Sequence, residues 1–163
     1  MRIIVDAMGG DNAPDEIVKG CVEALRRADG FELELIGDSR RIDELLGDRQ
    51  AFENRIFVTH TSEVITNDDK PTEAIKRKKD SSLVVGLHKI KFREADAFIS
   101  AGSTGALMAG SLLIPGRVPG VNRPALAPSS RSRKYPSAHV SVMPRESVVS
   151  NRTCAPRANA SAS

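Results

Sequence analysis

The amino-acid sequence predicts an α/β fold in which helices cover both faces of a mostly parallel sheet. Two observations carry this prediction. Short apolar runs alternate with amphipathic segments as far as residue 127, and glycine-rich turns follow several of the apolar runs. A helix between two strands returns the chain to the starting end of the sheet, so the strands pair in parallel. We therefore expect helices, sheet and helices in three layers.

Four apolar runs have the length and composition of buried strands. The first opens the chain, and the second is closed by Gly37 and Asp38. The expected strands cover residues 3–5, 33–36, 56–58 and 95–100.

Apolar residues at helical spacing predict the helices between these strands. From Pro14 onward they recur every three or four residues, and Asp15 and Glu16 occupy the first turn, where the helix dipole favours acidic side chains. Pro71 suits the start of another helix after a long loop at 61–70, because a proline at that position loses no hydrogen bond. The remaining helices are expected around residues 42–46, from 82 and at 104–113.

Charge and composition divide the chain near Pro128. Residues 1–127 hold 18 Lys and Arg against 20 Asp and Glu, whereas residues 128–163 hold 6 against 1 and include nine Ser and four Pro. We expect 1–127 to be the folded α/β part and 128–163 to be a basic tail, disordered or produced by a reading-frame shift. The alkaline isoelectric point comes from this tail, so it does not indicate that the folded part binds nucleic acid.

Cysteine and histidine residues indicate no metal site. Cys21 and Cys154 lie far apart, and His60, His88 and His139 are isolated, so metal-ligand spacing is missing. Cys21 falls on the apolar face of its predicted helix and is expected to be a buried thiol. The chain has no apolar run of about 18 residues, and it opens on a strand, so we expect a cytoplasmic protein, at most peripheral at a membrane.

Two glycine-rich turns, at residues 6–14 and 100–106, follow strands and open helices. In a parallel sheet such turns lie at the carboxyl ends of the strands, where ligands bind. Glycine lets the backbone approach a ligand, the N–H groups of the next helix point at an anion, and Ser103 and Thr104 add hydroxyl donors. Either turn alone could need its glycines only for geometry. Neither has the Walker or the G-x-G-x-x-G pattern, so a nucleotide is not specifically indicated.

Four consecutive cations at 76–79 are a third candidate feature. Such a run is usually a solvated helix face. It ends at Asp80 and Ser81, either of which can cap the next helix, so one lysine could face the same crevice as the glycine turns and hold a phosphate. Asp68 and Asp69 could position that lysine, or they could simply be solvated residues of the loop.

The order and spacing of the residues indicate neither a Ser-His-Asp set nor paired catalytic carboxylates. This suits a reaction in which an anion attacks an activated acyl group and the protein mainly positions the two.

Four segments together resemble the signatures of the bacterial phosphate acyltransferase family. In family order they are VDAMGGDNAP at 5–14, a second at 62–82 that ends in KKDSS, SAGSTGALMAG at 100–110 and GRVPGVNRPALA at 116–127. The resemblance implies transfer of a long-chain acyl group from acyl carrier protein to inorganic phosphate, which gives acyl-phosphate for phospholipid synthesis. It implies a Rossmann-like α/β/α core similar to isocitrate- and isopropylmalate-dehydrogenase-like proteins, no cofactor, a homodimer, and a cytoplasmic or loosely membrane-associated location.

The resemblance also implies which residues form the site. One wall would come from Asp6, Gly9, Gly10 and Asn12, and phosphate-binding N–H and hydroxyl groups from Gly102, Ser103, Thr104 and Gly105. The rim would hold Lys78, Lys79, Asp80 and Ser81, while Arg123 would meet an anion. No residue is assigned as the catalytic one. The family usually has Asn at the position of Ser103, and its chains are much longer, so we expect this chain to be a truncated, inactive part of the fold.

Two other interpretations remain open. One is a phosphate acetyl- or butyryltransferase that uses coenzyme A, or a decarboxylating dehydrogenase, on the same fold; the AMGGD segment at 7–11 argues against both. The other is a non-catalytic anion-binding module whose tail binds RNA or anionic lipid. The charges of the tail are dispersed and not interleaved with aromatic residues, which argues against nucleic-acid binding.

Overall fold

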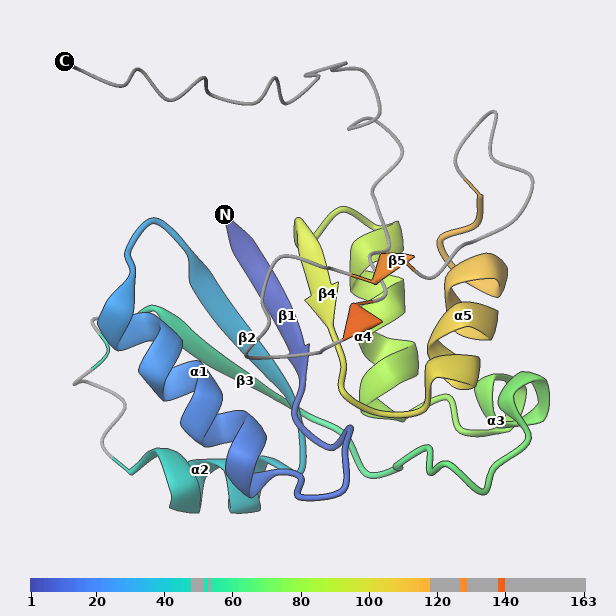
Figure 1. Ribbon diagram of the computed structural model, residues 1–163, viewed down its shortest axis with the longest axis horizontal. Helices are drawn as coiled ribbons and strands as arrows, with labels where there is room; N and C mark the ends of the chain where they lie inside the picture. The colour runs from blue at the N-terminus through green and yellow to red at the C-terminus, as the bar shows by residue number, and fades with distance from the viewer. Residues whose placement is uncertain (48–51, 53, 118–126, 129–137, 140–163) are drawn as a thin grey trace, which may run out of the picture.

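The computed structural model describes residues 1–47, 52, 54–117, 127–128 and 138–139 (Figure 1). Four of its strands form the main sheet, namely β1 (Arg2–Asp6), β2 (Glu32–Gly37), β3 (Ile56–His60) and β4 (Ala97–Ile99). The helices are α1 (Asp15–Arg27), α2 (Ser39–Leu46), α3 (Pro71–Arg77), α4 (Ser82–Lys91) and α5 (Thr104–Leu113). A separate antiparallel pair is formed by β5 (Ala127–Pro128) and β6 (Ala138–His139).

The main sheet is parallel throughout and has the strand order β3-β2-β1-β4. The chain lays β1, β2 and β3 side by side in one direction, and then crosses back to place β4 on the free side of β1. Strand order therefore reverses between β1 and β4. In open parallel sheets the crevice at such a reversal, outside the carboxyl ends of the strands, is where ligands bind.

Helices cover both faces of this sheet, as the sequence predicts (Figure 1). Val5, Leu33 and Leu35 pack on one face with α1 and α2, through buried side chains such as Val18 and Ile42. The opposite face packs against α3, α4 and α5. Its buried residues are Ile4, Ile36, Ile65, Ala74, Ile75, Leu83, Val84, Leu87, Ile90, Phe98, Ala106, Leu107 and Ile114. Each large aliphatic side chain in these layers stabilises the fold by about 1.5–3 kcal/mol.

Side chains just before the helices fix where they begin. Asp38 accepts a hydrogen bond from the N–H of Arg40, Ser81 from Val84 and Ser103 from Ala106, and these bonds cap α2, α4 and α5. Pro71 occupies the first turn of α3, as expected. The capping serines therefore fix the residues at which α4 and α5 begin.

The predicted strands and helices are present in the predicted order, and the three-layer α/β arrangement is confirmed. The fourth strand is shorter than the expected 95–100 and covers Ala97–Ile99, although the backbone N–H of Asp96 still donates to the carbonyl of Arg2 over 2.9 Å. Most of the expected tail, 128–163, lies outside the described residues, so its nature stays a prediction.

The side chain of Cys21 is buried as expected, and this burial raises the pKa of its thiol to about 11. Cys154 lies outside the described residues. Among the residues placed by the structure, no helix is long and apolar enough for a membrane span. In the same part of the chain, acidic, His and Cys side chains do not gather into a group of three or more that could hold a metal ion.

Candidate functional site

The two predicted glycine turns meet where β1 and β4 end. Val5 pairs with Ile99 in the parallel register, so the next residues along each strand, Asp6 and Ser100, lie side by side. The Ser100 hydroxyl donates to Asp6 Oδ2 over 2.7 Å, and the N–H of Gly102 donates to Ser100 Oγ over 3.1 Å. Two segments 94 residues apart in sequence are thus joined at the point where the strand order reverses.

Gly9 has no room for a side chain at this junction. A Cβ on Gly9 would lie 2.5 Å from Asp6 Oδ2, 2.8 Å from Ser100 Oγ and 2.9 Å from the backbone nitrogen of Gly102. A Cβ on Gly102 would in turn lie 3.1 Å from Gly9 Cα. Gly10 has a φ of 125°, a conformation that L side chains rarely adopt. The glycines of the first turn are therefore required by close backbone packing and by conformation.

Asp6 is buried and points into the turns. Its Oδ1 accepts the N–H of Met8 over 3.1 Å, and its Oδ2 accepts the Ser100 hydroxyl. Burial raises the pKa of Asp6 above its ordinary value, although hydrogen bonds from Ser82, Ser100 and the backbone oppose the shift. Because its oxygens are engaged with the protein, Asp6 holds the architecture of the site.

The N-terminus of α5 opens directly from the second turn. Ser103 caps the helix through the N–H of Ala106 at 3.4 Å, and the first two residues of the helix, Thr104 and Gly105, are exposed. The first N–H groups of a helix have no partner within the helix, and the dipole there favours a negative charge. A Cβ on Gly105 would lie 3.0 Å from Pro71 Cγ, so the start of α3 borders the same helix end (Figure 1).

Lys78 is held by the loop that precedes α3. Its ammonium group donates to the carbonyl of Val64 over 2.8 Å and to Asp69 Oδ2 over 2.6 Å. Asp69 also accepts the N–H and hydroxyl of Thr66, and the hydrogen bond from Lys78 is the main cause that lowers the pKa of Asp69 to about 2. Asp69 thus positions a lysine, whereas Asp68 is exposed.

Asp80 and Ser81 join the same loop to the start of α4. Asp80 Oδ2 accepts the N–H of Ser62 over 2.8 Å and also its hydroxyl, and these bonds lower the pKa of Asp80. Ser81 is fully buried, and its hydroxyl donates to the carbonyl of Lys78 over 2.8 Å. Both residues fix the backbone behind the site.

The structure therefore brings only part of the predicted set together. Asp6, Gly9, Gly10 and Gly102 meet, and Ser103, Thr104 and Gly105 follow at the start of α5. Lys78, Asp80 and Ser81 are engaged with residues 62–69 and with α4, while Lys79 and Asn12 are exposed. Arg123 lies outside the described residues.

Two serines of this junction were not singled out from the sequence. Ser100 bridges the turns, and Ser82, at the first position of α4, lowers the pKa of Asp6 by a hydrogen bond. Both stand within the predicted signature segments. The available signal was that Ser100 directly follows a strand, but only the strand order puts it beside Asp6.

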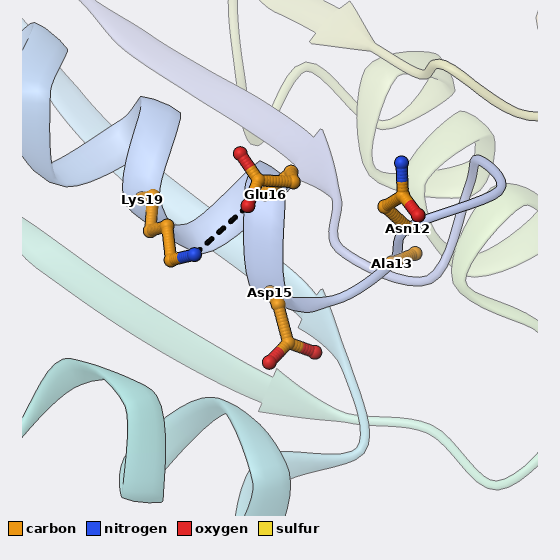
Figure 2. Close-up of a pocket in the computed structure, with 5 residues that line it drawn as sticks. All are labelled: Asn12, Ala13, Asp15, Glu16 and Lys19. Carbon is orange, nitrogen blue, oxygen red and sulfur yellow. Dashed lines mark hydrogen bonds and ion pairs between the residues drawn. The ribbon is translucent and has the colours of Figure 1, made fainter.

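A shallow pocket of about 460 Å³ lies beside this junction, at the start of α1 (Figure 2). Asn12, Ala13, Asp15, Glu16 and Lys19 line it, and Lys19 is bound to Glu16 over 2.8 Å. A phosphate there would face two carboxylates and a lysine that is already paired. The pocket shares only Asn12 with the predicted site and does not suit an anion.

Residues 1–139 match the family described as fatty acid synthesis protein. The chain belongs to this family. Two proteins similar to this chain are both named phosphate acyltransferase. The one from Acetivibrio thermocellus is 56% identical over 126 residues, which are 77% of this chain and 37% of the relative. The one from Thermoanaerobacter pseudethanolicus is 53% identical over 128 residues, which are 78% of this chain and 37% of the relative. A third of the same name, from Alkaliphilus oremlandii, is 48% identical over 158 residues, 96% of this chain and 45% of the relative.

These findings confirm the predicted resemblance to phosphate acyltransferases. The chain spans less than half the length of these curated relatives. The family match runs past residue 127, and the boundary expected there stays a prediction.

Proposed function

We propose that this chain is the N-terminal part of an acyltransferase that transfers a long-chain acyl group from acyl carrier protein to inorganic phosphate. The product, acyl-phosphate, would serve phospholipid synthesis. One observation carries the proposal: the two glycine turns meet where strand order reverses, and α5 begins there with Thr104 and Gly105 exposed. The name of the relatives, phosphate acyltransferase, supports acyl transfer to phosphate.

The proposed chemistry asks the protein to hold an anion beside an acyl thioester. An oxygen of hydrogen phosphate attacks the thioester carbonyl carbon, the carbon–sulfur bond breaks, and the phosphate proton passes to the departing thiolate. The products are acyl-phosphate and the free thiol of the carrier. The N–H groups of Thr104 and Gly105 and the hydroxyls of Ser103 and Thr104 bind the phosphate, and the α5 dipole stabilises its charge.

Within this proposal, Asp6, Gly9, Gly10 and Asn12 shape one wall of the site. The rim holds Lys78, Lys79, Asp80 and Ser81, and Arg123 binds an anion. We further propose a cytoplasmic protein, peripheral at the membrane at most, that uses no cofactor and forms a homodimer in its full-length form. Because the chain spans less than half of its relatives, we propose that it binds phosphate but does not turn over acyl carrier protein alone. A reading-frame shift near residue 128 would account for the basic tail.

A phosphate titration followed by amide NMR tests the anion site. We expect inorganic phosphate to shift the amide signals of Gly102, Thr104 and Gly105. Thr104→Asp should abolish these shifts, because it places a carboxylate at the anion site. Thr104→Asn is the matched control, because asparagine has nearly the size of aspartate but carries no charge, and this variant should keep the shifts. Shifts confined to residues 12–19, or no shifts at all, would contradict the proposed site.

An acyl-transfer assay tests the reaction. Acyl carrier protein loaded with a long-chain acyl group is incubated with radiolabelled phosphate, and labelled acyl-phosphate is separated from free phosphate by chromatography. We expect no product from this chain, and product when it is co-expressed with the part of the Acetivibrio thermocellus relative to which it does not align. If the mixture binds both substrates and forms no acyl-phosphate, the proposed reaction is wrong.

A further inference from the structure

The Ser100 hydroxyl stands between the carboxylate of Asp6 and the backbone of the second glycine turn. It donates to Asp6 Oδ2 over 2.7 Å and accepts the N–H of Gly102 over 3.1 Å. We infer that Ser100 is a positioning residue, which holds the start of α5 in the orientation that binds phosphate. This inference depends on the proposed function only for the identity of the ligand.

The chemistry of a hydroxyl explains why a serine serves this position. A serine hydroxyl has one hydrogen to donate and lone pairs that accept. The hydrogen is directed to the carboxylate, because a bond to an ionised oxygen is stronger than one to a neutral acceptor. The lone pairs of Ser100 Oγ are thereby turned toward Gly102. Asp6 in turn is held by the N–H of Met8, so its carboxylate is fixed when it orients the serine.

The position of Gly102 makes this contact consequential for α5. Gly102 precedes the helix by two residues, and only the capping residue Ser103 stands between it and Thr104. Gly9 packs closely against the same atoms, since a Cβ there would lie 2.8 Å from Ser100 Oγ and 2.9 Å from the Gly102 nitrogen. Removal of the hydroxyl therefore frees the turn that aims the Thr104 and Gly105 N–H groups.

A purely structural role for Ser100 makes a different prediction. If the hydroxyl only satisfied the buried Asp6, its loss would lower global stability and leave the geometry of the α5 start, and the phosphate affinity of the folded protein, unchanged. The two roles separate when local amide exchange and phosphate affinity are measured in variants of known stability.

The test compares Ser100→Ala and Ser100→Thr with Ser111→Ala in the full chain. Ser111 is the matched control, since it also makes one short hydroxyl bond, to the carbonyl of Leu107 over 2.6 Å, but lies in the last turns of α5. Hydrogen exchange at the amides of residues 102–105, inorganic phosphate affinity by NMR titration, and urea unfolding are measured for each variant. The wild-type chain with sulfate in place of phosphate reports general anion binding.

We expect Ser100→Ala to speed exchange at Gly102 roughly fivefold to tenfold and to weaken phosphate binding by about the same factor, as the loss of one hydrogen bond would. Ser100→Thr keeps the hydroxyl and should restore both values, and Ser111→Ala should change neither. Wild-type phosphate affinity in Ser100→Ala, or an equal loss in Ser111→Ala, would overturn the inference. If the wild-type chain binds no phosphate, the proposed function fails, and the exchange rates still decide whether Ser100 holds the turn.

Discussion

Substitution of Gly9 by alanine is the sharpest perturbation of the junction between the two turns. The new methyl group would approach Asp6 Oδ2, Ser100 Oγ and the nitrogen of Gly102 to 2.5, 2.8 and 2.9 Å. Ordinary contact begins at 3.4 Å, so these atoms must move by 0.5 to 0.9 Å. One of them belongs to the backbone and the other two are joined by a hydrogen bond, so none can move independently.

The expected cost follows from these contacts. Overpacking of a tight site costs about 1–3 kcal/mol. Loss of the hydrogen bond between Ser100 and Gly102 adds about 1 kcal/mol. Alanine makes the unfolded chain less flexible than glycine does, and this stabilises the folded state by about 0.4–1 kcal/mol. The free energy of unfolding should therefore fall by about 1–4 kcal/mol in Gly9→Ala.

Gly20→Ala is the matched control, because Gly20 lies within α1 and a Cβ there would meet nothing within 4 Å. It should stabilise the protein by about 0.5–1 kcal/mol, since alanine favours the helix. Urea unfolding of the three proteins, at a concentration low enough to exclude association, measures both effects. An unconstrained surface substitution changes the free energy of unfolding by about 0.5 kcal/mol or less. If Gly9→Ala changes it by no more than that, the close packing of the turns is refuted.

Three further predictions concern the charged groups around the sheet. The pKa of Asp69 is about 2 in the folded protein, so its contribution to stability should be present above about pH 4 and lost as the pH falls toward 2. Urea unfolding from pH 2 to 5 measures how the free energy of unfolding changes with pH, and this change should be weaker in Lys78→Met. An unchanged pH dependence in Lys78→Met would contradict the prediction. The pKa of Asp6 is raised, so the stability of the wild type relative to Asp6→Asn should fall as the pH rises above about 4, and a difference independent of pH would count against the burial of its charge. Lys89 forms an ion pair with the buried Glu34 over 2.7 Å, so Lys89→Met should lower the free energy of unfolding by about 2–3 kcal/mol in urea. Most of this loss should be recovered when Glu34→Leu is added, and additive losses would argue against the pair.

Local patterns in the sequence predict much of the fold. Apolar runs locate the four strands, and the helix expected at 104–113 has the observed bounds. The helix expected around 42–46 begins earlier, at Ser39, because the carboxylate of Asp38 accepts the N–H of Arg40 and caps it there. The sequence alone places Asp38 at the end of the preceding strand and does not show that its side chain also caps the helix.

The arrangement of the site was harder to predict, because it depends on which strands become neighbours. Local spacing places a glycine turn after each of two strands, yet it does not place β4 next to β1. The bond between Ser100 and Asp6 follows from that pairing alone. Likewise, four adjacent cations look equivalent in the sequence, and only the folded loop selects Lys78 as the partner of Asp69.

Because the proposed site depends on the pairing of β4 with β1, phosphate binding should be coupled to the stability of the whole sheet. The turn proposed to bind phosphate is held by a bond between residues 94 positions apart, which requires that β4 has paired with β1. A ligand that binds only the folded state stabilises it by about 2.7 kcal/mol at one hundred times its dissociation constant. Phosphate should therefore raise the unfolding midpoint of the wild type. It should raise that of Gly9→Ala less at the same concentration, because the displaced turn binds phosphate more weakly.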